Sequence, residues 1–166
     1  MSSMEKRRHP ALTDPQTRLP NDLHWDTVYG VVFGAAHRGI PLTLILMEVD
    51  HHLRWKEERS PEEVARVMMA LGAALDGATR DSDLVARTDE NRFSFALLGC
   101  NLAGGQLATE RLDACLEPLR RDAGMKFSIG VASHSLEMKR SEDLLSEAEK
   151  ALRRAQARGG GVEFQS

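Results

Sequence analysis

The chain has 166 residues, of which 42% are hydrophobic and 28% charged, the balance of one ordinary globular domain. Its formal net charge of −3 argues against a general nucleic-acid binder, which is usually strongly basic. No apolar run reaches the length of a membrane span or forms a signal peptide, so we expect a cytoplasmic protein without a membrane span. Cys100 and Cys115 fit small core positions in a reducing compartment.

The N-terminal part predicts a polar lead-in followed by a helix and a strand. Residues 1–13 show no clear periodicity, and we interpret them as a linker or a short lead-in helix before a domain over 14–166. Apolar side chains at helical spacing predict a helix over 22–37, which a glycine and a proline end. The apolar run at 42–49 stops at acidic residues and predicts a buried strand.

The remainder predicts a central hairpin between further helices and strands. Ser60, Pro61 and Glu63 form a helix-start signal, and the apolar spacing continues to about Thr79. The later elements expected are strands at 84–87 and 93–98, a helix at 107–119, a strand at 126–132, a helix capped by Ser141, and an edge strand at 162–164. This order predicts an α/β (α+β) domain with a mixed sheet and helices on its faces.

Five segments, taken in order, resemble the motifs of one family. Residues 14–21 are similar to D-x-L-T-G-L-P-N, residues 41–50 to P-L-x-L-L-L-x-D-x-D, and residues 128–132 to S-I-G-V-A. Residues 80–93 stand where the family has R-x-x-D, a strand and G-G-D-E-F, and residues 148–159 resemble A-D-x-A-L-Y-x-A-K-x-x-G. The chain therefore resembles the GGDEF domain of diguanylate cyclases. The resemblance implies the palm-like fold of nucleotidyl cyclases, with a central mixed or antiparallel sheet flanked by helices.

The signature of that family is replaced in this chain. In active members the hairpin turn with G-G-D-E-F approaches GTP, and its third residue binds metal. Aligned with it, this chain reads Asp89-Glu90-Asn91-Arg92-Phe93. Carboxylates at Asp89 and Glu90 would repel the phosphates, and Asn91 is a poorer ligand for a hard cation than an acid. We interpret the signature as degenerate.

The other substrate positions of the family point the same way. Glu48 and Asp50 keep the acids of the first strand, but the guanine-reading positions are occupied by Lys56 and Ala65. We therefore expect no catalytic residue, no required cofactor and no magnesium or other metal, although a weak magnesium contact at Glu48 and Asp50 stays open. The adjacent histidines at 51–52 lack a spaced third ligand, so they do not predict a zinc or iron site.

A second site of the family, which binds the product cyclic di-GMP, is kept. The family uses R-x-x-D five residues before the signature, plus an arginine on the next helix. Arg80 and Asp83 have this spacing, and Arg111 falls on the helix arginine. Arginine pairs with phosphate or with guanine O6 and N7. A second R-x-x-D string at 140–143 shows that the pattern is common, so only the three residues together favour a ligand site.

Three functions follow from these observations. The leading hypothesis is a non-catalytic receptor of the bacterial second messenger cyclic di-GMP, with a ligand-linked homodimer as one way to act. The first alternative is a nucleotide-independent interaction domain whose protein partner, of unknown identity, binds the face around 89–92 and Trp55. There Trp55 would anchor the partner if exposed, or fill the old pocket if buried. The second alternative is a weak or residual diguanylate cyclase that depends on Glu48 and Asp50.

Overall fold

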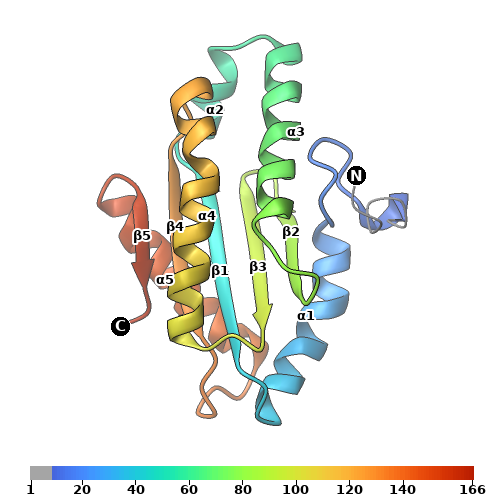
Figure 1. Ribbon diagram of the computed structural model, residues 1–166, viewed down its shortest axis with the longest axis vertical. Coiled ribbons are helices and arrows are strands. Elements are labelled where there is room, and N and C mark those ends of the chain that lie inside the picture. Colours follow the sequence, from blue (N-terminus) through green and yellow to red (C-terminus); the bar gives the residue numbers. More distant parts are fainter. Residues whose placement is uncertain (1–8) are drawn as a thin grey trace.

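The apolar run of the sequence forms the central strand of a mixed sheet (Figure 1). The computed structural model describes residues 9–166. Its strands lie in the order β2 (Asp83–Asp89), β3 (Arg92–Leu98), β1 (Leu42–Val49), β4 (Phe127–Ser133) and β5 (Gly161–Phe164). All pairs are antiparallel except β4–β5, which is parallel. The predicted fold class, an α+β domain with a central mixed sheet, is confirmed.

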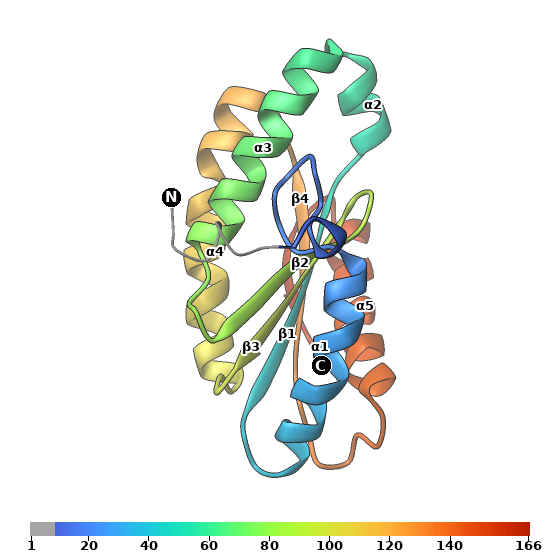
Figure 2. The ribbon, with the colours of Figure 1, turned by 90° about the vertical axis from the view of Figure 1, so that its right-hand side faces the viewer.

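Helices cover both faces of the sheet (Figure 2). One pair packs on each face: α1 (Asp22–His37) with α5 (Ser141–Ala157), and α3 (Pro61–Gly77) with α4 (Leu102–Ala123). Along β1, Leu44 and Leu46 contribute to the core under α1 and α5, whereas Ile45 and Met47 contribute to the core under α3 and α4. Because both faces are buried, β1 is apolar throughout instead of alternating.

Two short elements complete the described chain. Helix α2 (His52–Glu57) follows β1, and a 3-10 turn, η2 (Pro10–Leu12), precedes a loop closed by a bridge between Thr13 and Pro20. The sequence did not predict α2. Residues 1–8 of the expected lead-in lie outside the described residues, so the boundary near residue 13 stays a prediction.

Two helix starts differ from the sequence prediction. Helix α4 begins at Leu102 instead of residue 107, because the Asn101 side chain caps it by accepting from the Gly104 N–H at 3.0 Å. Ser141 is the first residue of α5 rather than its cap, so that prediction was wrong. The Asp143 carboxylate does the capping, since it accepts the backbone N–H groups of Lys139 and Arg140.

The two cysteines differ in burial: Cys100 is buried, whereas Cys115 is only half-buried. Over residues 9–166, no helix combines the length and the apolar character needed to cross a membrane.

Candidate functional site

The turn of the β2–β3 hairpin lies over the end of β1 and is fastened there by Asn91. The Asn91 side-chain amide donates to the Val49 carbonyl at 2.8 Å, and its oxygen accepts from the Val49 N–H at 3.2 Å. The amide thus pairs with the backbone as a neighbouring strand would. One N–H and the oxygen of the Asn91 amide are engaged by this contact, which fixes the turn to the end of β1.

An arginine holds the acid of the first strand. Glu48 lies opposite Arg92 in the β1–β3 register, and the two side chains approach to 3.8 Å. The Arg92 guanidinium donates to the Glu149 carboxylate on α5 at 2.8 Å, and the Gln156 amide donates to Glu48 at 3.3 Å. All three charged side chains of this cluster are at least two-thirds buried. The positive charge beside Glu48 is therefore supplied by the protein itself.

Asp50 has a separate set of partners. Both of its carboxylate oxygens accept from the Ser128 hydroxyl, at 2.8 and 3.0 Å, and its backbone N–H donates to the Lys126 carbonyl. Asp50 borders a hollow of about 400 Å³ that also includes His51, His52 and Asn91. Within residues 9–166 no three His, Cys, Asp or Glu side chains are grouped so as to hold a metal ion. Arg92 places a positive charge 3.8 Å from Glu48, which opposes a divalent cation at that carboxylate.

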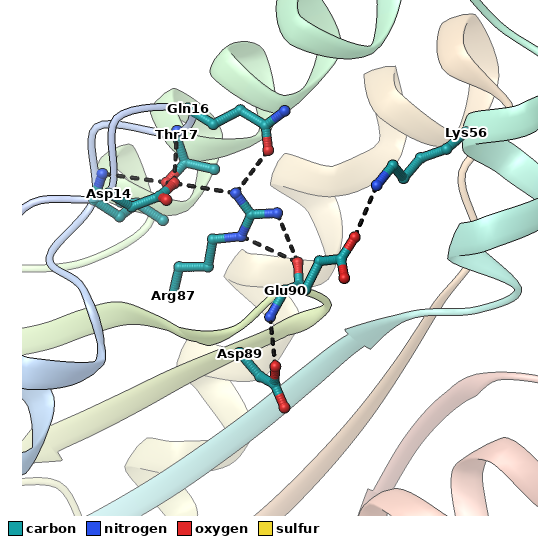
Figure 3. Close-up of polar contacts among 8 residues, drawn as sticks. Asp14, Gln16, Thr17, Lys56, Arg87, Asp89 and Glu90 are labelled. Carbon is teal, nitrogen blue, oxygen red and sulfur yellow. Dashed lines mark hydrogen bonds and ion pairs between the residues drawn. The ribbon is translucent and has the colours of Figure 1, made fainter. Parts of the chain in front are cut away.

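A network of charged side chains ties the N-terminal loop to the hairpin turn (Figure 3). The Arg87 guanidinium donates to the Glu90 carbonyl at 2.7 Å, to Gln16 at 2.7 Å and to Asp14 at 3.2 Å. Lys56, on α2, donates to the Glu90 carboxylate at 2.7 Å. The hydrogen bond and charge of Lys56 lower the pKa of Glu90. Lys56 and Glu90, at two positions that the family motifs mark, thus form an ion pair between α2 and the hairpin turn.

Side chains fill the space behind the Lys56–Glu90 ion pair. Between α2, α3 and the hairpin only about 20 Å³ stays open, lined by Trp55, Lys56, Glu90 and Asn91 among others. Trp55 is 6% exposed, and its indole N–H donates to the Ala123 carbonyl at 2.8 Å. The hypothesis of an exposed Trp55 as a partner anchor was therefore wrong, and the buried alternative holds. Ala65 lies exposed on α3 and does not line this space.

The three residues of the expected ligand site lie around the start of β2. Arg80 is exposed in the turn after α3, Asp83 begins β2, and Arg111 is exposed on α4. All three are close enough to act on the Cys100 thiol: its pKa is raised mainly by burial and also by Asp83, while Arg80 and Arg111 oppose the rise. The charges of three residues from different segments thus act on one thiol.

The two arginines of this neighbourhood are not engaged by acids. In the described part of the chain, neither Arg80 nor Arg111 takes part in a salt bridge. The Asp83 carboxylate accepts from the Arg80 backbone N–H at 2.9 Å, so it shapes the turn while leaving the Arg80 guanidinium exposed. A groove of about 580 Å³ runs from Arg80 and Asp83 along β2 towards η2 and α1.

Sequence reasoning missed the partners that neutralise the strand edge. Glu149 and Arg92 are 57 residues apart, and Asp14 and Arg87 are 73 apart. No motif spacing marks such pairs. The one available signal was chemical: an arginine placed beside the acid of a first strand calls for further acids around it.

These features define a class: an α+β domain of nucleotidyl-cyclase type, with a hairpin turn over the end of its central strand. A family model described as "Diguanylate cyclase, GGDEF domain" matches residues 11–161. The chain belongs to the GGDEF domain family.

Relatives with assigned activities share this domain. Diguanylate cyclase DgcP of Pseudomonas aeruginosa is 29% identical over 116 residues, which are 69% of this chain and 17% of DgcP. The probable diguanylate cyclase DgcC of Escherichia coli K12 is 25% identical over 161 residues, 93% of this chain and 43% of DgcC. The chain thus spans less than half the length of either relative.

A solved structure has the same fold. The GGDEF domain of DgcB from Caulobacter crescentus, in complex with c-di-GMP, superposes with a TM-score of 0.81 at 18% identity. The match covers 95% of this chain and 96% of that one. At this identity the likeness establishes the fold.

Proposed function

We propose that this GGDEF domain binds cyclic di-GMP without synthesising it, and that Arg80, Asp83 and Arg111 form its ligand site. One contrast carries the proposal. The cations Lys56 and Arg92 on the former substrate face are neutralised by acids at 2.7–2.8 Å, whereas the Arg80 and Arg111 guanidinium groups are exposed and unpaired in the described chain. Of these four cations, only Arg80 and Arg111 are free to meet an anionic ligand.

The former substrate face opposes cyclase activity in three ways. Asp89 and Glu90 set carboxylates at the turn, where like charges repel triphosphate. Arg92 takes the place of a cation beside Glu48. The adjoining space of about 20 Å³ has no room for a guanine base. These observations support a degenerate signature and disfavour the residual-cyclase alternative.

The chemistry of the second location suits a ligand with two phosphates and two guanines. Each arginine fork can bind a phosphate, or guanine O6 and N7, through two parallel hydrogen bonds. Asp83 can accept from the N1 and N2 hydrogens of guanine through its remaining lone pairs. With about 1–3 kcal/mol for each bidentate contact, several contacts support micromolar affinity, about −8 kcal/mol. The DgcB domain, which has the same fold, was solved with this dinucleotide.

The test is a calorimetric titration of cyclic di-GMP into the full chain. We expect saturable micromolar binding that Arg80→Ala and Arg111→Ala each weaken by about 10- to 100-fold, the loss of one bidentate contact. Arg153→Ala, which removes an exposed arginine from α5, is the matched control and should bind like the unmodified protein. Folded protein that produces no heat would contradict the proposal and favour the nucleotide-independent alternative.

A parallel assay addresses catalysis. Incubation of the protein with GTP and magnesium or manganese should yield no cyclic di-GMP. Product that disappears in Asp50→Ala would instead revive the residual-cyclase alternative. Binding without synthesis leaves the output to a protein partner that reads the occupied site, or to a second copy of the chain linked through the ligand.

A further inference from the structure

The outer side of α1 exposes apolar side chains. Leu23 is 58% exposed and Val31 is 74% exposed, a fraction that no other large apolar side chain of residues 9–166 exceeds. With the exposed Thr27, Gly30 and Gly34 they form one side of the helix, the α1 face. Below the N-terminal loop, α1 forms the right-hand edge of the molecule in Figure 1, and this side faces the viewer in Figure 2. The α1 face is therefore open to a partner.

Packing within the described chain does not require the two glycines of the α1 face. Glycine inside a helix is less favourable than alanine, because it loses more conformational freedom on folding. A methyl group on Gly30 or Gly34 would meet no atom within 4 Å, whereas one on Gly72, in α3, would overlap the Thr17 backbone. Gly72 thus serves a close contact inside the chain. Glycines on an exposed helix face instead allow a second helix to approach from outside.

The exposed positions of α1 are symmetric about the peptide between Gly30 and Val31. Exposed residues occur in pairs at equal distances on either side of this peptide: Gly30 and Val31, Thr27 and Gly34, Leu23 and Arg38, Asp22 and Gly39. A two-fold axis at this peptide would relate two antiparallel α1 helices and set each of these residues opposite an exposed residue of the second copy. Val31 of one copy then lies over Gly30 of the other, where a side chain is missing.

The two ends of α1 carry opposite charges. Asp22 and Asp26 lie at its start and Arg38 at its C-terminal cap, and within residues 9–166 none of the three forms a salt bridge. Desolvation, together with the negative charges of Asp26 and Asp89, raises the pKa of Asp22. In the antiparallel pair Arg38 lies opposite Leu23, which stands between the two aspartates. Its alkyl stem can cover Leu23 while its guanidinium meets the carboxylates.

We propose that the α1 face is a self-association surface, on which a second copy of this chain packs its own α1 antiparallel across the Gly30–Val31 peptide. The partner is a second copy because the same helix, reversed, supplies a base opposite each acidic end and a small residue opposite Val31. A parallel pair would instead bring like charges together. A helix of 16 residues is about 24 Å long, and contact along one such helix is smaller than a standard interface, so the association is weak and reversible. The surface contains no residue of the proposed ligand site and does not depend on the ligand.

Sedimentation equilibrium of the unmodified chain without ligand tests the association. We expect a monomer–dimer equilibrium with a dissociation constant between about 10 µM and 1 mM. Gly34→Gln should weaken it by about tenfold or more, because a long polar side chain separates the helices. Glutamine is a better helix former than glycine, so this variant should fold at least as stably as the unmodified protein. Ala73→Gln, which places the same side chain on the exposed side of α3, is the matched control and should associate normally.

Exchanging charges between the ends of α1 tests the antiparallel arrangement. Asp26→Lys and Arg38→Glu should each weaken self-association by about tenfold or more at low salt, because each sets like charges opposite one another at both ends of the dimer. An equimolar mixture of these two variants should associate at least about tenfold more tightly than either variant alone. In the mixed dimer each end joins one acid and one base, as in the unmodified pair.

Protein that stays monomeric up to about 1 mM would overturn the inference. A dimer that neither Gly34→Gln nor the charge exchanges alter would also overturn it, because the contact would then lie on another surface. So would a dimer that forms only with cyclic di-GMP and is lost in Arg80→Ala. If cyclic di-GMP does not bind at all, the proposed function fails, whereas self-association through the α1 face stands on its own measurements.

Discussion

At the scale of single residues, the charge of the strand edge depends on Arg92. Its guanidinium lies between Glu48 and Glu149, at 3.8 and 2.8 Å, where two carboxylates would otherwise face each other. A guanidinium is permanently charged and always present, whereas the occupancy of a metal site depends on the concentration of the metal ion. One guanidinium between two carboxylates leaves the cluster with a single net negative charge, whatever the supply of divalent cations. In a receptor this would separate ligand binding from metal status.

Asp14 allows a residue-scale prediction about pH. Burial alone would raise the pKa of this carboxyl, but hydrogen bonds from Thr17 at 2.6 and 2.8 Å, together with Arg87, outweigh it and lower the pKa below its usual 3.8. A carboxyl with a depressed folded-state pKa stabilises the protein above its unfolded pKa, and this contribution is lost as pH falls through the folded value.

We therefore expect Asp14→Asn to lower the free energy of unfolding at pH 7 by about 2 kcal/mol, the typical contribution of hydrogen bonds to a charged group. The difference from the unmodified protein should shrink as the pH falls below 3.8. Urea titrations at pH 7 and at low pH measure both. A difference that stays constant with pH would show that packing, and not the charge, accounts for the loss.

At the scale of elements, α4 is placed by its glycines. A methyl group on Gly105 would come within 2.8 Å of the Thr43 side chain on β1, so only glycine lets the first turn of α4 approach the sheet there. Gly30, in the exposed part of α1, would place the same methyl group in open space. Both glycines thus lie within helices, but Gly105 packs tightly against the sheet whereas Gly30 faces open space.

Their alanine substitutions should have opposite effects. Gly105→Ala should destabilise the domain by about 1–3 kcal/mol through overpacking. Gly30→Ala should stabilise it by about 0.5–1 kcal/mol through helix propensity. Urea midpoints compare the two directly. Shifts in the same direction would contradict the packing of α4 against Thr43.

These details mark the limit of what the sequence could predict. Apolar periodicity predicted the central strand at 42–49, the hairpin and the helix at 22–37, because burial imposes those periods. It missed the first turn of α4, since paired glycines resemble a loop until the close approach to Thr43 is known. It also missed α2, whose six residues are too few for a helical period.

The residues of the candidate site also fall into those that the sequence predicted and those that it could not. Family spacing alone predicted that Arg80, Asp83 and Arg111 belong together, and all three influence the pKa of the Cys100 thiol. Whether Trp55 is exposed depended on the Ala123 carbonyl, 68 residues away, and no local pattern carries that information.

At the scale of the whole molecule, β2 connects the proposed ligand site to the hairpin turn at its other end. Asp83 begins the strand and Asp89 ends it, so the proposed ligand site and the hairpin turn lie at opposite ends of one edge strand. A ligand that binds only the folded state raises its stability by RT ln(1 + [L]/Kd), about 2.7 kcal/mol at 100 times Kd. Binding at one end of β2 should therefore stabilise the entire domain.

Thermal melting with and without cyclic di-GMP should show this gain. For a domain of this size, about 2.7 kcal/mol corresponds to a rise in Tm of roughly 5–10 °C. Arg80→Ala, with an affinity about 10- to 100-fold weaker, should reduce the rise to about half or less, and GTP with magnesium should cause none. A GTP-dependent rise that survives Arg80→Ala would locate nucleotide binding at the former substrate face instead.

The packing of the two tryptophans gives the domain a pair of optical reporters. Trp55 belongs to the core under α3 and α4 and lies beneath the Arg59 guanidinium, at 4.6 Å. Trp25 belongs to the core under α1 and α5 and stacks on Tyr29, at 5.1 Å. The chain contains no other tryptophan, so each face of the sheet has its own intrinsic fluorophore. With Trp25 replaced by phenylalanine, the tryptophan emission would report the loosening of α3 and α4 alone. With Trp55 replaced, it would report the loosening of α1 and α5 alone.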